Sequence, residues 1–199
     1  MLKKPKILVV GSFMMDLIAS TSRAPKEGET VVGMKFQTAP GGKGANQAVQ
    51  CARLGADVTM VGRVGADSFG TILKNAAKDA GVDVSHVTVD PEESSGVGHI
   101  TLEITEHNAK NRITVCPGAM KQEHIVWLKD AMGQYDIVIM QLELPMDIVE
   151  TVAKWAKAAG VPVMLNPAPA APLSDELLAN VTYLSPNEHE AALMSGHEI

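Results

Sequence analysis

The chain has 199 residues, of which 46% are hydrophobic, and a net charge of −6 at pH 7. This length and apolar fraction are typical of one sizeable globular domain with its own core. The acidic balance, without a basic patch, excludes nucleic acid as a partner. The first apolar run, residues 7–10, is too short for a signal peptide or a membrane span, so we expect a cytoplasmic protein with no membrane partner.

The cysteines and histidines show no metal-binding spacing. Cys51 and Cys116 do not form a CxxC pair, and the six histidines contain no HExxH motif. We therefore expect two reduced thiols and no zinc site.

Apolar strands and amphipathic helices alternate along most of the chain. Continuous apolar runs predict buried strands, and residues recurring at helical spacing predict helices that end near glycines. The expected strands are residues 7–10, 57–64, 84–89, 136–140, 161–165 and 181–184. The expected helices are 43–54, 67–80, 122–132, 146–159, 175–179 and one that begins after residue 187. This alternation predicts a doubly wound α/β fold, with a mostly parallel sheet flanked by helices.

Two regions interrupt the alternation and predict a second, smaller sheet. Residues 13–18 and 29–38 read as strands, and residues 96–106 and 112–116 read as a hairpin joined by a turn at 107–111. We expect the small sheet to comprise residues 13–40 and 96–116. The α/β core then comprises residues 1–12, 41–95 and 117–199.

A glycine-rich turn, Gly41-Gly42-Lys43-Gly44, leads directly into the helix expected at 43–54. Glycines let backbone N–H groups approach a ligand, and a helix N-terminus favours an anionic or oxygen-rich ligand. Lys43 and Asn46 are three residues apart and can point to the same place. The order of the glycines matches neither a Walker loop nor a dinucleotide-binding fingerprint. These residue types suit a polyhydroxy compound, although a tight connection without a ligand remains an alternative.

Several further polar residues stand where strands end or helices begin. Asp16 is the only charge in an apolar stretch and is either a hydroxyl acceptor or a turn aspartate. Glu143 follows the strand 136–140, and the carboxyl ends of parallel strands are where ligands bind; a solvated loop glutamate is the alternative. Asn187 and Glu190 have the spacing of a helix capping box.

Taken together, four motifs resemble the ribokinase branch of the ribokinase/phosphofructokinase-B sugar kinases. They are Gly11-Ser12 with Asp16, the turn at residues 41–48, Asn166-Pro167-Ala168-Pro169-Ala170, and Pro186-Asn187-Glu188-His189-Glu190. The resemblance implies transfer of the γ-phosphoryl group of ATP to a primary hydroxyl of D-ribose. It also implies that the small sheet is a lid over the sugar and joins two subunits into a homodimer.

The resemblance assigns roles to individual residues. The sugar-binding positions are Asp16, Gly42, Lys43, Asn46 and Glu143. Asn187 matches a position on the nucleotide side, and Glu190 matches one that organises Mg²⁺, through water. Phosphoryl transfer needs this positioning, charge neutralisation by the metal and a base for the hydroxyl proton.

Two departures from the family pattern affect the expected activity. The family continues for about another third of its length, which carries the catalytic aspartate and the loop for a monovalent cation. We therefore expect no catalytic residue and little turnover in these 199 residues, and a non-catalytic sugar-binding module is an alternative. Met14 stands where ribokinases commonly have asparagine, which leaves another pentose, a deoxyribose or a nucleoside open as substrate. A dehydrogenase is disfavoured because Gly11-Ser12-Phe13-Met14 lacks the dinucleotide-binding glycines.

Overall fold

The computed structural model describes residues 3–105, 108–118 and 120–197. Its main sheet has the strand order β10-β9-β8-β1-β4-β5, and every neighbouring pair is parallel. The strands are β1 (Lys6–Val10), β4 (Asp57–Gly65), β5 (Val87–Asp90), β8 (Ile137–Gln141), β9 (Val163–Asn166) and β10 (Tyr183–Leu184). The helices are α1 (Lys43–Arg53), α2 (Ser68–Asp79), α3 (Leu128–Ala131), α4 (Met146–Ala158), α5 (Asp175–Asn180) and α6 (Glu188–Ser195).

Hydrophobic cores lie on both faces of the main sheet, as a doubly wound fold requires. Leu8 and Val10 of β1 point to one face, where they join side chains of α3, α4 and α5. Val9 points to the other face and joins side chains of α1 and α2. Because all three are fully buried, β1 reads in the sequence as a continuous apolar run. The predicted fold class is confirmed.

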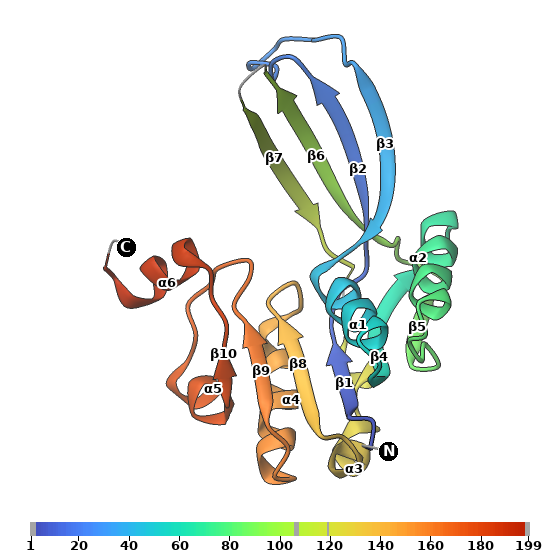
Figure 1. Ribbon diagram of the computed structural model, residues 1–199, viewed down its shortest axis with the longest axis vertical. Coiled ribbons are helices and arrows are strands. Elements are labelled where there is room, and N and C mark those ends of the chain that lie inside the picture. The colour runs from blue at the N-terminus through green and yellow to red at the C-terminus, as the bar shows by residue number, and fades with distance from the viewer. Residues whose placement is uncertain (1–2, 106–107, 119, 198–199) are drawn as a thin grey trace.

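The small sheet stands beyond the carboxyl ends of the main-sheet strands (Figure 1). Its order is β3-β2-β6-β7, with β2 and β6 parallel and the other two pairs antiparallel. The predicted second sheet is thus present, and its strands are β2 (Met14–Thr21), β3 (Lys35–Gly41), β6 (Gly96–Ile104) and β7 (Ala109–Cys116). The expected turn at 107–111 begins at a residue outside the described part, and residues 109–111 already belong to β7.

Two predicted elements were placed wrongly. The strand expected at 29–38 starts only at Lys35, because pairing with β2 runs from Ser20↔Lys35 to Met14↔Gly41. The helix expected at 122–132 is broken into 3-10 turns around the four residues of α3. Ile125, Leu128 and Met132 are fully buried, so the apolar spacing was informative. The branched and aromatic side chains of residues 125–127 have low helix propensity, which favours the tighter turns.

None of the described helices is long and apolar enough to cross a lipid bilayer.

Candidate functional site

A cavity of about 400 Å³ lies between the small sheet and the carboxyl ends of the main-sheet strands. It brings together six of the seven residues predicted to bind ligand, although they come from four separate parts of the chain. Asn187 is not among the residues that line it. The lining comprises Met14, Asp16, Gly42, Lys43, Asn46, Gly98, Ile100, Ile113, Val115, Glu143, Ala168, Pro169 and Glu190.

The glycines of the turn allow helix α1 to begin directly against the end of β1. Gly42 has φ +96°, a conformation that L side chains rarely adopt. A Cβ on Gly44 would lie 2.6 Å from both the Cα of Gly11 and the N of Ser12, so only glycine permits this approach. The N–H of Ala45 donates to the carbonyl of Ser12 at 3.0 Å and secures the contact. The first turn of α1 is thereby held at the floor of the cavity.

Glu143 is held against this helix N-terminus by two hydrogen bonds. The Ser12 hydroxyl donates to its Oε2 at 2.5 Å, and the backbone N–H of Lys43 donates to the same oxygen at 2.8 Å. Both contacts use Oε2, which leaves Oε1 as the oxygen for a ligand. Ser12 was not predicted as a site residue. The feature of the sequence that could have identified Ser12 is its place two residues after a buried strand, which Glu143 shares.

The carboxylate of Asp16 occupies a space that two glycines leave open on neighbouring strands. A Cβ on Gly41 of β3 would lie 2.7 Å from its Oδ2, and a Cβ on Gly98 of β6 would lie 2.6 Å from its Oδ1. Burial, followed by the negative charge of Glu143, raises the pKa of Asp16 above its ordinary value. Within the described part of the chain no cation pairs with this carboxylate, so it is suited to accept hydrogen bonds from hydroxyl groups.

A second pair of polar side chains ties α1 to the main sheet. The amide of Gln141, at the end of β8, donates to Oε1 of Gln47 at 2.6 Å. Gln141 is fully buried, and among the described residues its own Oε1 has no hydrogen-bond partner. The sequence analysis missed this pair. The feature of the sequence that could have identified it is Gln141, a single amide side chain at the end of an otherwise apolar strand.

Asn187 and Glu190 form the predicted capping box at the start of α6. The N–H of Glu190 donates to Oδ1 of Asn187 at 2.8 Å, and the N–H of Asn187 donates to Oε2 of Glu190 at 2.9 Å. Glu190 is buried and lines the cavity, whereas Asn187 is exposed and is not part of the lining. Within residues 3–105, 108–118 and 120–197, no three Asp, Glu, His or Cys side chains are grouped to hold a metal ion.

The lining of the cavity combines polar and apolar groups. Polar groups come from α1, β2, Glu143 and α6. Apolar side chains come from the small sheet, namely Met14, Ile100, Ile113 and Val115. Such a lining suits a small molecule that carries hydroxyl groups on a carbon skeleton.

Comparisons with known proteins agree with this chemistry. The chain is 44% identical to a ribokinase of Bacillus subtilis over 191 residues, which cover 94% of this chain and 64% of that protein. It is 36% identical to a deoxyribokinase of Salmonella typhi over 194 residues, covering 96% and 62%. The structure of Arabidopsis thaliana ribokinase complexed with ribose and ATP has a TM-score of 0.83 and 34% identity, covering 98% and 64%.

This chain spans less than two thirds of the length of each of these three proteins. The pfkB family of carbohydrate kinases matches residues 4–199, which is nearly all of the chain. The match therefore includes both sheets and every residue that lines the cavity. On this evidence, the chain belongs to the pfkB family of carbohydrate kinases.

Proposed function

We propose that this chain is the sugar-binding part of an ATP-dependent kinase that converts D-ribose to ribose 5-phosphate. The observation that carries the proposal is the single cavity in which Asp16 and Glu143 lie with Lys43 and Asn46 around the start of α1. Carboxylates accept hydrogen bonds from sugar hydroxyls, and the lysine and amide groups donate to sugar oxygens. The ribokinase relatives, and the solved ribokinase complexed with ribose and ATP, support the same substrates.

The nucleotide belongs on the side of α6, next to the sugar. Asn187 is proposed to face the nucleotide, and Glu190 to organise its Mg²⁺ through water. The donor chemistry fits this indirect role, because Glu190 is a buried carboxylate at the cavity wall whose Oε2 already accepts a backbone N–H. Bound Mg²⁺ neutralises charge on the transferred phosphoryl group. A monovalent cation would bind outside these 199 residues.

The small sheet is proposed to act as a lid over the sugar and to pair two subunits. Two large apolar side chains in and just before β3 are exposed, Met34 at 58% and Phe36 at 65%, and neither lines the cavity. Exposed apolar area of this kind favours association. Sedimentation analysis over a concentration range is expected to show a dimer. Phe36→Asp should shift it toward monomer, and a wild-type monomer at all concentrations would exclude the pairing.

A deoxyribose is the second candidate substrate, and Met14 is the observation that favours it. Met14 is buried at the cavity wall, where its thioether offers a sugar hydroxyl almost no hydrogen bonding. A hydroxyl left without a partner costs about 1–3 kcal/mol, so a sugar that lacks it loses nothing there. The deoxyribokinase relative is in line with this reading.

One titration series separates these proposals. We expect ribose to raise the melting temperature of the 199-residue protein, and Mg·ATP to produce little ribose phosphate, because the catalytic base is proposed to lie outside this segment. Met14→Asn should strengthen ribose binding relative to 2-deoxyribose by about 5- to 10-fold, the value of one hydrogen bond. Tighter binding of 2-deoxyribose to the wild type would favour the second candidate. Stabilisation by neither sugar, in a protein that melts cooperatively, would contradict both.

A further inference from the structure

Arg63 is a buried arginine whose hydrogen-bonding capacity is only partly used. It lies near the end of β4 with 3% of its surface exposed, and its Nε donates to Oδ2 of Asp90 at 3.0 Å. Among the described residues, neither Nη1 nor Nη2 has a partner. Leaving a buried donor unpaired costs about 1–3 kcal/mol, so two such groups on one side chain call for a physical explanation.

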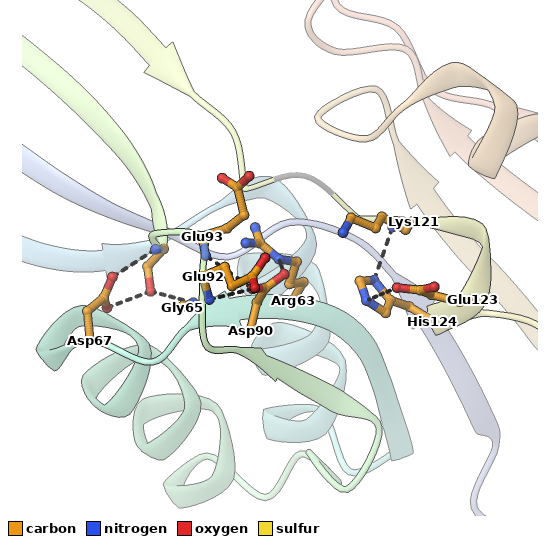
Figure 2. A network of polar contacts seen from close by, with 10 residues as sticks. Arg63, Gly65, Asp67, Asp90, Glu92, Glu93, Lys121, Glu123 and His124 are labelled. Carbon is orange, nitrogen blue, oxygen red and sulfur yellow. Dashed lines mark hydrogen bonds and ion pairs between the residues drawn. The ribbon is translucent and has the colours of Figure 1, made fainter.

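The partner of Arg63 holds the chain segment that leads into the small sheet. Asp90 ends β5, and its Oδ1 accepts the backbone N–H groups of Glu92 at 2.9 Å and Glu93 at 3.1 Å. These backbone N–H groups, followed by the Arg63 guanidinium, lower the pKa of Asp90 to about 2. The carboxylate is therefore charged at neutral pH, and it joins Arg63 to the segment 91–95 (Figure 2).

The segment that returns from the small sheet passes the same guanidinium. Gly118 follows β7, and a Cβ on it would lie 3.2 Å from Nη1 of Arg63. The two crossing segments also touch each other, since a Cβ on Gly96 would lie 3.0 Å from the N of Gly118. Arg63 thus lies where two of the four connections between the sheets meet, the one that enters β6 and the one that leaves β7.

A neighbouring anchor, by contrast, is fully paired. The hydroxyl of Ser95 donates to Oδ1 of Asp67 at 2.7 Å, and its N–H donates to Oδ2 at 2.8 Å. The same hydroxyl accepts the N–H of Gly65 at 2.9 Å. Ser95 directly precedes β6, so one connection is fixed at this point. Arg63, in contrast, keeps hydrogen-bond donors that no described residue uses.

We propose that Arg63 is a positioning residue that sets the small sheet over the sugar cavity. The cavity takes Asp16 from the small sheet and Glu143 from the main sheet, so its shape depends on how the two sheets are held. With Ser95 as the fixed point, a shift of the small sheet brings backbone carbonyls of the crossing segments to the free N–H groups of Arg63. Binding of a molecule in the cavity and hydrogen bonding of Arg63 to these carbonyls then favour each other. That the occupant is a sugar rests on the proposed function.

The test compares hydrogen exchange and ribose affinity in two variants. Arg63→Met keeps an unbranched apolar stem, shorter than the arginine side chain, and removes every donor. Without ligand, it should speed exchange in β6 and β7 while β1 and β8 stay protected, and it should weaken ribose binding about tenfold. Arg63→Lys, which retains one charged donor for Asp90, should give smaller changes and replaces Arg63→Met if that variant does not fold. Ile148→Val, on the buried side of α4 and outside both crossing segments, is the control for a general loss of stability.

The possible outcomes distinguish a failure of the positioning role of Arg63 from a failure of the proposed sugar. If Arg63→Met behaves like Ile148→Val, with exchange in β6 and β7 unchanged and ribose affinity intact, Arg63 is structural and the inference is wrong. If the wild-type protein binds no pentose but exchange still rises selectively in β6 and β7, the positioning role stands and the proposed sugar fails. Selective exchange together with weaker ribose binding supports both.

Discussion

Asp16→Asn is expected to weaken ribose binding about 10- to 150-fold, the range for a hydrogen bond to a charged group. The same substitution should raise the melting temperature. Burial and the charge of Glu143 raise the pKa of Asp16 in the folded protein, so folding opposes its ionisation. Above the ordinary aspartate pKa of about 3.9, the unfolded chain holds fewer protons at this residue, and stability falls as pH rises toward the raised pKa. Asparagine carries no such charge and escapes this cost at neutral pH.

Calorimetric titration with ribose and a thermal melt at pH 7 measure both effects. Asp79→Asn, on the exposed end of α2, is the matched control and should leave ribose affinity and melting temperature nearly unchanged. In the wild type, ribose affinity should decline as the pH is lowered through the raised pKa of Asp16. If Asp16→Asn binds ribose normally, Asp16 does not contact the sugar. A lower melting temperature of this variant would contradict the electrostatic explanation.

Gly44→Ala is expected to destabilise the fold by about 1–3 kcal/mol, the usual cost of overpacking, and to remove ribose binding. Its Cβ would meet two backbone atoms at 2.6 Å, and backbone cannot rotate aside as a side chain can. The start of α1 must then move away from Ser12. That movement breaks the contact between the Lys43 N–H and Glu143 and displaces Asn46 from the cavity.

Denaturant unfolding and the ribose titration together test this expectation. Gly133→Ala is the matched control, because a Cβ there meets no atom within 4 Å and the residue does not have a positive φ. It should unfold like the wild type and bind ribose equally well. Wild-type stability in the Gly44→Ala protein would mean that α1 does not need this close approach.

Local patterns in the sequence were enough for much of the fold. Continuous apolar runs such as residues 7–10 identified the strands of the main sheet, because both faces of that sheet are covered by helices. The capping box of Asn187 and Glu190 was predicted for a similar reason, since its partners are three residues apart. The turn before α1 was predicted from its glycines, and Lys43 and Asn46 do line one cavity.

Contacts between distant residues were decided only by the tertiary structure. Ser12 and Glu143 are 131 residues apart, and nothing near either residue specifies the other. The space for Asp16 depends on strand register, which brings Gly98 opposite it on β6 and Gly41 close to it on β3. Register also moved the start of β3 to Lys35, because pairing partners rather than propensity determine where an exposed strand begins. Apolar patterns and caps act over a few residues, whereas the cavity forms only when the two sheets are brought together.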